Sequence, residues 1–212
     1  MPTAIDTSPA PRAEGADQRV FMRVDWNGYL QLLALRGERS VPRITYCEGV
    51  VELMSPSVHH GYIKKTIARM LEAWALREGH HFDGYGSWTL KSEEHDRGLE
   101  PDECYIVRDI GDAEPTCPDL AIEVIWTHGG LDKLDIYRAL GVQEVWLWRQ
   151  RAGRGAIEVH TLRDGAYVQI DVSELLPQVD RELLARHART KPQNAAVLAY
   201  LADLDAAAEA GS

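Results

Sequence analysis

The sequence contains few cysteines and little positive charge, and both shortages narrow the classes of protein to which it can belong. Its three cysteines, Cys47, Cys104 and Cys117, are isolated, and no C-x-x-C pair occurs, so neither a disulfide framework nor a zinc knuckle is predicted. Buried reduced thiols in a cytoplasmic protein are the simpler expectation. The net charge is −10. Because neutralising phosphates supplies most of the affinity for nucleic acid, any such contact must come from a local basic patch.

Long apolar runs and glycine-rich phosphate loops are also absent. No apolar stretch approaches the length that spans a bilayer, so no membrane partner is expected. The N-terminus lacks the apolar core of a signal peptide. Residues 1–18 are rich in proline, alanine and charge and are predicted to be a disordered tail. We expect one domain over residues 19–190 and a helical tail over 191–212.

The pattern of apolar residues predicts a mixture of helices and strands. Helices are expected at 24–37, 60–78 and 131–140 and again after residue 180. Strands are expected at 82–90, 102–109, 119–126 and 144–149, with hairpins at 43–54 and 157–172 and a polar loop at 91–100. This order is not a regular βαβ series. It predicts an α/β (α+β) domain with a mixed central β-sheet flanked by helices.

The apolar strand at 119–126 contains an internal glutamate, Glu123, and this is the most informative residue of the chain. A charge in an apolar run is costly unless it is paired or binds a metal. Asp119 lies on the same strand face, but four residues of strand separate the two by about 13 Å, too far to share one ion. Glu123 therefore needs a partner from a neighbouring strand.

Asp102 is the natural partner, because it opens a strand just before the Glu123 strand and a short acidic turn joins the two. Two carboxylates from adjacent strands, with waters and a substrate phosphate, make a typical Mg²⁺ site. Lys133 follows a glycine turn, which could fold it back over the carboxylates to stabilise a transition state. The structural alternatives are a paired Glu123, a turn-capping Asp102 and a solvated Lys133 paired with an aspartate.

Four motifs, PDECYIV, PDLAIEV, DKLDIY and GVQEVWLW, occur in an order that resembles the Uma-two type restriction endonuclease family, a branch of the PD-(D/E)XK nuclease superfamily. The resemblance spans roughly residues 46–184 and includes the hairpin CEGVVELMSPS and the histidine opening the next helix. It implies a restriction-endonuclease-like core in which Asp102 and Glu123 bind the metal. The superfamily's lysine position is Ile125 here, and the resemblance suggests that Lys133 substitutes from the following helix.

Further candidates follow from the same resemblance. The superfamily often has another glutamate, for which Glu52 is the nearest match, although the polar face of an ordinary hairpin explains Glu52 equally well. His60 matches a histidine that the family tends to keep. His60, Lys64 and Lys65 share a helix that could meet a phosphate backbone, while a capping histidine and a solvated helix face are the simpler interpretation.

These observations predict a divalent-metal-dependent endonuclease that hydrolyses DNA phosphodiester bonds. Asp102 and Glu123 would hold Mg²⁺ or Mn²⁺, Lys133 would orient water or stabilise the transition state, and Glu52 would add an outer ligand or a base. The main alternative is a non-catalytic member of the same fold that binds nucleic acid or a protein. A third is a hydrolase of small phosphate esters with a closed pocket. A homodimer would supply the two sites needed to cut both strands.

Overall fold

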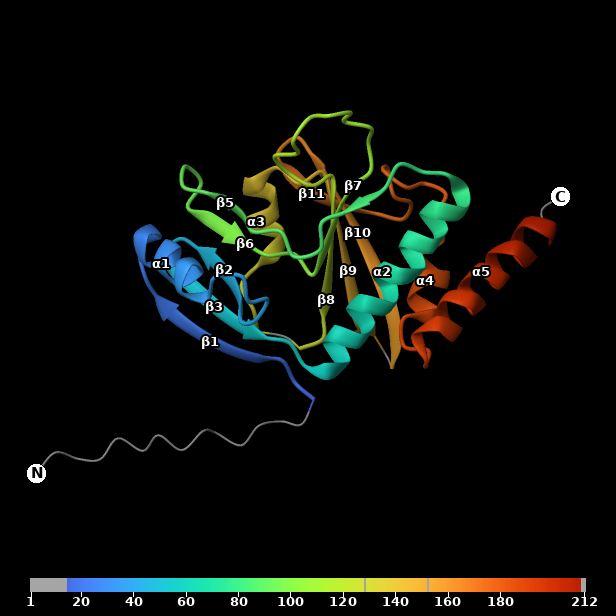
Figure 1. Cartoon of the computed structure of the whole chain (residues 1–212), viewed down its shortest axis with the longest axis horizontal. Coiled ribbons are helices and arrows are strands. Elements are labelled where there is room, and N and C mark those ends of the chain that lie inside the picture. Colours follow the sequence, from blue (N-terminus) through green and yellow to red (C-terminus); the bar gives the residue numbers. More distant parts are fainter. Residues whose placement is uncertain (1–14, 128, 152, 211–212) are drawn as a thin grey trace, which may run out of the picture.

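Two β-sheets organise the computed structural model, which describes residues 15–127, 129–151 and 153–210 (Figure 1). The five-stranded sheet has the order β1-β3-β2-β6-β5 and the six-stranded sheet the order β11-β10-β9-β8-β7-β4. The first contains β1 (Gln18–Arg23), β2 (Arg43–Cys47), β3 (Val50–Ser55), β5 (Leu90–Ser92) and β6 (Arg97–Leu99). The second contains β4 (Asp83–Gly84), β7 (Glu103–Ile106), β8 (Leu120–Ile125), β9 (Glu144–Arg151), β10 (Arg154–Arg163) and β11 (Ala166–Ile170). Because β8 and β9 are parallel and their other neighbours antiparallel, the larger sheet is mixed, as predicted.

The described helices cover both faces of the larger sheet and the outside of the smaller one (Figure 1). They are α1 (Trp26–Arg36), α2 (Val58–Glu78), α3 (Lys133–Leu140), α4 (Arg181–His187) and α5 (Gln193–Ala210). Local sequence fixes their ends: the side chains of Asp25, Ser57 and Asp132 accept backbone N–H bonds at the N-termini of α1, α2 and α3. None of the described helices is long and apolar enough to cross a bilayer.

Strand β8 is buried on both faces, and each face meets a different helix. Its even-numbered residues, Leu120, Ile122 and Val124, belong to the apolar cluster that contains α2. Ala121 belongs instead to the cluster that contains α3. Because strand residues alternate between faces, Glu123, which is the only ionisable residue of β8, points to the α3 side.

The segment 82–100 differs from the prediction of one strand and a polar loop. Only Asp83–Gly84 forms a strand in the first half, and Leu90–Ser92 pairs with Arg97–Leu99 as a hairpin that joins β2. Because most side chains of residues 91–100 are polar, the sequence pattern predicted a loop where the structure has two short strands. Arg97 is only 7% exposed because Glu48 and Asp135 pair with it.

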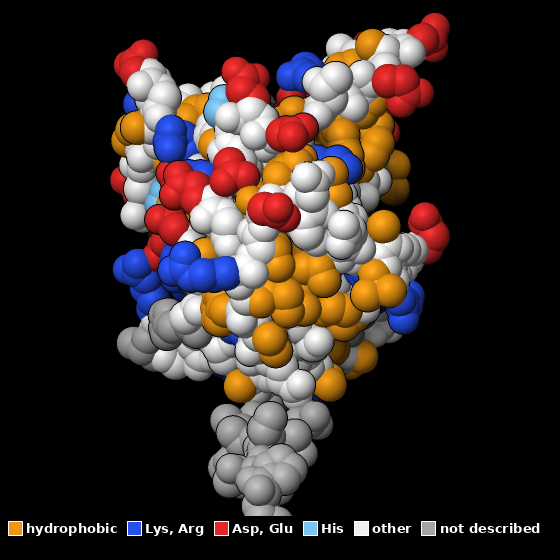
Figure 2. Space-filling view, turned by 90° about the vertical axis from the view of Figure 1, so that its left-hand side faces the viewer, with side chains coloured by type: hydrophobic (Ala, Val, Ile, Leu, Met, Phe, Trp, Pro, Cys, Tyr) orange, Lys and Arg blue, Asp and Glu red, His pale blue; other side chains and the backbone are white. Residues whose placement is uncertain are grey.

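The N-terminal segment also differs from the predicted tail of residues 1–18. Residues 1–14 lie outside the described part of the chain, but Asp17 is buried and β1 begins at Gln18. The exposed apolar side chains of β1 and α1 include Val20, Phe21 and Leu35. Figure 2 shows the molecule from this side, where hydrophobic side chains gather in the lower centre of the face and acidic ones above them.

Candidate functional site

Strand pairing brings the two predicted carboxylates together. Strand β7 pairs antiparallel with β8, with Glu103 opposite Ile122, so the same register sets Asp102 opposite Glu123. Both side chains have 0% exposure. The expectation that the two strands pair is confirmed, and Asp119 takes no part: its carboxylate accepts from the Val107 backbone and pairs with Arg108.

Helix α3 supplies two donors to Glu123, one for each carboxylate oxygen. The Lys133 ammonium lies 2.5 Å from Oε2 and the Tyr137 hydroxyl donates to Oε1 at 2.6 Å. The two residues are four apart on the helix and therefore share one face. Asp132 caps the helix at the point where the chain returns from the turn. The structure thus brings Lys133 back to the carboxylate, as the sequence suggested.

Donors from three separate parts of the described chain hold Asp102. Arg43 at the start of β2 reaches Oδ1 at 3.1 Å, and the backbone N–H of Val124 donates to Oδ2 at 2.8 Å. His60 Nε2 lies 2.9 Å from both oxygens. Arg43 also donates to the Pro101 carbonyl at 2.5 Å, which anchors the chain just before Asp102.

His60 bridges Asp102 to a second buried aspartate, Asp17. Its Nδ1 lies 3.1 Å from Asp17 Oδ2, and the imidazole is 1% exposed. Ser57 caps α2 through the His60 backbone N–H, which fixes the first turn of the helix. His60 is predicted to contact nucleic acid, but its side chain is enclosed between two carboxylates and is not presented to solvent.

Glu52 belongs to the same cluster, whose other charged members are Asp17, Arg19, Arg43, His60, Asp102, Glu123 and Lys133. Arg19 donates to its Oε1 at 2.8 Å and the Leu131 backbone N–H to its Oε2 at 2.7 Å. At 2% exposure, Glu52 points into the protein rather than along a solvated hairpin face. Gly130 allows this approach, because a Cβ atom there would lie 3.1 Å from Glu52 Oε2 and 3.3 Å from Arg19 Nε.

The two central carboxylates have opposite electrostatic environments. Burial raises the pKa of Asp102, but the charges of Arg43 and His60 outweigh it and hold that pKa well below its ordinary value. Burial raises the pKa of Glu123, and the adjacent Asp102 charge adds to this, against the opposing effect of Lys133. Burial would lower the pKa of His60, yet Asp102 and Asp17 raise it to about 9. The imidazole is therefore charged at neutral pH.

A cavity of about 420 Å³ leads from solvent to this cluster. Its walls include Arg19, Glu52, Lys133 and Arg149, together with Ile125, which stands at the superfamily's lysine position. Asp102 and Glu123 do not line it and lie beneath the Lys133 ammonium, whose side chain is 15% exposed. Lys133 is therefore the group through which the cavity meets the buried carboxylates.

The described residues form no cage of protein ligands for a divalent cation, so any cation bound here would share its coordination with a substrate and waters. Among the described residues, no group of three or more His, Cys, Asp or Glu side chains has metal-binding geometry. Mg²⁺ is often bound by only one or two carboxylates, with waters and substrate phosphates completing the octahedron. Within the described chain, each oxygen of Glu123 accepts one hydrogen bond, whereas each oxygen of Asp102 already contacts two donors, so Glu123 is the carboxylate better able to accept a further ligand.

Four residues of the cluster were not predicted. Tyr137 could have been found, because it lies one helical turn after Lys133. Arg43 opens an apolar strand, which is a weaker signal. Asp17 and Arg19 lie in or beside the predicted tail, and nothing in their local sequence marks them.

The two predicted phosphate-binding lysines lie on α2 and are not part of this cluster. Lys64 pairs loosely with Glu103 at 3.5 Å, while Lys65 is exposed.

Asp102 and Glu123 thus lie opposite each other on two antiparallel strands, beneath a lysine carried by α3, on a mixed sheet flanked by helices. The family described as "Putative restriction endonuclease" (Uma2) matches residues 26–190, and the chain belongs to this family. A crystal structure from Anabaena variabilis ATCC 29413, described as a putative nuclease belonging to DUF820, aligns over 69% of this chain and 90% of its own. It is 16% identical, with a TM-score of 0.41. A comparison with curated proteins found no match.

Proposed function

We propose that this protein is a divalent-metal-dependent endonuclease that hydrolyses DNA phosphodiester bonds. The observation that supports it best is the Lys133–Glu123 contact of 2.5 Å, directly opposite Asp102, at the end of a solvent-connected cavity. Family membership supports a nuclease-like function. We infer that Asp102, Glu123 and Lys133 carry its chemistry.

Asp102 and Glu123 would hold Mg²⁺ or Mn²⁺ together with a phosphate oxygen of the substrate. When bound, the cation would lower the pKa of a water and neutralise charge on the phosphate. His60 and Arg43 keep Asp102 ionised and oriented, which a hard cation requires of its ligand.

Lys133 is the residue that faces both the cavity and the carboxylates. Its ammonium can donate to a phosphate oxygen as negative charge develops there. Tyr137 keeps Glu123 in place from the same helix face. Glu52 is fixed by Arg19 and the Leu131 backbone at the cavity wall, where it could hold a water near the substrate.

The test is cleavage of supercoiled plasmid and labelled duplexes by the purified protein with Mg²⁺, Mn²⁺ or EDTA. We expect metal-dependent cleavage by wild type, and losses of about 100-fold or more for Lys133→Met and Glu123→Ala. Lys91→Met is the matched control, because Lys91 is exposed on β5 and does not line the cavity. Absence of metal-dependent cleavage by wild type across several substrates would overturn the proposal.

One observation favours a second function, in which the protein has the same fold but is not catalytic and instead binds nucleic acid or a protein partner. The cluster contains four acids and four bases that already pair with one another. The acids are Asp17, Glu52, Asp102 and Glu123, and the bases are Arg19, Arg43, His60 and Lys133. This function predicts that wild type binds its partner but that Mn²⁺ neither binds nor shifts the melting temperature.

A further inference from the structure

A groove of about 880 Å³ lies between the β9–β10 hairpin and helix α4, outside the cluster described above. Four arginines line it: Arg154 from β10, Arg181 and Arg186 from α4, and Arg189 just after α4. Glu182 is the acidic residue in its lining. In a chain with a net charge of −10, this is a marked local excess of positive charge.

The arginines are presented to solvent and only partly neutralised. Arg154, Arg186 and Arg189 are exposed, and the ion pair between Arg186 and Asp203 is long at 3.6 Å. Arg181 is held more firmly, because it donates to the carbonyls of Ile157 and Asp171 at 3.0 and 2.7 Å. The groove therefore combines one fixed guanidinium with several free to adapt to a ligand.

Beneath Gly155, which lines the groove, lies a buried donor that has no partner within the described chain. The indole N–H of Trp148 makes no hydrogen bond within the described chain, although the side chain is 0% exposed. It lies directly beneath Gly155, where a Cβ atom would come within 2.7 Å of Nε1 and 3.0 Å of the Ala185 carbonyl. Glycine at this position therefore allows the β10 backbone to pack closely against Trp148 and α4.

The groove and the candidate site lie at the same end of the larger sheet but on opposite faces, the groove on the α4 side and the site on the α3 side. Arg149 of β9 lines the catalytic cavity, and the same hairpin continues into Gly153 and Arg154 of the groove. On the opposite wall, the Arg189 guanidinium lies 6.0 Å from the ring centre of Trp126, the residue that follows β8. Arg189 and Arg149 thus both lie near the C-terminal end of the paired strands β8 and β9, close to the strand that bears Glu123.

We propose that this arginine-lined groove binds the phosphate backbone of the DNA duplex whose cleavage is proposed above. Arginine guanidiniums suit phosphate oxygens, and several spaced along one groove match a repeating polyanion better than a single small anion. The proposal rests on the proposed function for its substrate class. In this proposal the main DNA-binding surface is the groove, and not Lys64 and Lys65 on α2 as the sequence suggested.

The experiment measures binding, so that its failure is distinct from a failure of catalysis. A short fluorescent duplex is titrated with protein in EDTA at several salt concentrations, and anisotropy gives the affinity. We expect Arg154→Glu/Arg186→Glu to weaken binding by about tenfold or more. The slope of log affinity against log salt should fall by about 0.9 for each phosphate that the variant no longer neutralises.

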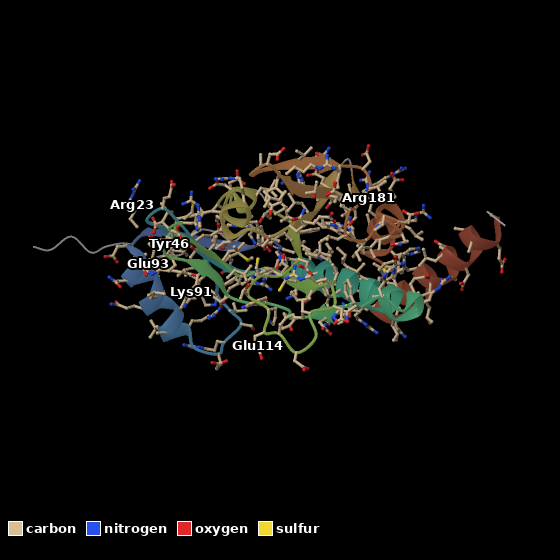
Figure 3. All side chains as sticks on the ribbon, turned by 90° about the horizontal axis from the view of Figure 1, so that it is seen from above. Arg23, Tyr46, Lys91, Glu93, Glu114 and Arg181 are labelled. Carbon is tan, nitrogen blue, oxygen red and sulfur yellow. The ribbon has the colours of Figure 1, made fainter. Side chains whose placement is uncertain are left out.

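The matched control is Arg23→Glu/Lys91→Glu, which changes the net charge by the same amount. Both residues are exposed, and Figure 3 shows them at the end of the molecule opposite Arg181. We expect this variant to bind within about twofold of wild type. Circular dichroism melting of both variants verifies that the fold is retained, and Arg189→Ala provides a milder second test.

Any of the following outcomes would overturn the proposal for the groove: no duplex binding by wild type, equal weakening by both double variants, or full affinity in the groove variant. Saturable, arginine-dependent binding of inorganic phosphate or a nucleoside monophosphate without duplex binding would also overturn it. Groove-dependent binding without any metal-dependent cleavage would support the groove and reject the proposed function.

Discussion

The carboxylates of Asp102 and Glu123 face each other, yet replacing them with amides should affect stability very differently. Asp102→Asn removes the negative charge that pairs with Arg43 and His60, whose side chains are 7% and 1% exposed. Neither cation can reach solvent without opening the core. Breaking a buried ion pair from one side costs about 3–5 kcal/mol, and we expect that loss in the free energy of unfolding.

Glu123→Gln should leave the free energy of unfolding unchanged or raise it by up to about 1 kcal/mol. The amide oxygen can still accept from the Tyr137 hydroxyl. Lys133 is partly exposed and lines the cavity, so its ammonium can turn to water. The substitution also removes the repulsion between two adjacent buried carboxylates. The charge of Glu123 is therefore retained here at the expense of stability.

The pH dependence gives each effect its own signature. The pKa of Asp102 is lowered, so its contribution is complete above the ordinary value of 3.8 and is lost only as the pH falls through the still lower folded value. The pKa of Glu123 is raised above its ordinary 4.5. Its charge therefore costs stability above the folded pKa, and the advantage of Glu123→Gln should disappear as the pH falls toward 4.5.

Urea unfolding of the metal-free protein, followed by circular dichroism at several pH values, measures both variants against wild type. The difference between Asp102→Asn and Glu123→Gln at pH 7 should be at least about 3 kcal/mol. Equal losses for the two variants, or a larger loss for Glu123→Gln, would show that the donors around Asp102 do not stabilise its charge as the geometry implies.

Three shorter predictions concern single groups. The imidazole of His60 should titrate in NMR with a pKa of about 9, and the stability it contributes, complete below 6.5, should be lost as the pH rises through about 9; a midpoint near 6.5 would contradict this. Tyr137→Phe should cost about 1.5–3 kcal/mol in urea unfolding, because a buried donor to the Glu123 carboxylate is removed. Gly98→Ala should cost about 1–3 kcal/mol in calorimetry, since its Cβ would lie 2.3 Å from the Tyr29 hydroxyl; an unchanged melting temperature would refute the packing there.

Much of the site could be predicted because its core is local in sequence. Glu123 stands out in an apolar strand, and a turn capped by Asp132 returns the chain to it within ten residues. Lys133 and Tyr137 then meet the carboxylate through helix geometry alone. The pairing of Asp102 with Glu123 needed only that two strands consecutive in the chain, β7 and β8, pair antiparallel.

The residues that the sequence did not predict come mostly from distant segments. Asp17 and Arg43 reach the cluster only because β1 and β2 assemble into the smaller sheet beside the larger one. His60 has an ordinary place at a helix start, and its role depends on two aspartates that are 43 and 42 residues away in the chain. No local pattern encodes such long-range pairing.

The arginine-lined groove shows the same contrast between what local sequence predicts and what long-range packing brings together. Its arginines are scattered between residues 154 and 189 and form no basic run, so composition alone argued only that a basic patch was required. By itself, the sequence determined the periodic strands and helices, their caps and the carboxylate–lysine chemistry, because these follow from neighbours along the chain. Tertiary structure decided which charges surround Asp102 and which face is basic, because both depend on strands and helices packing together across the fold.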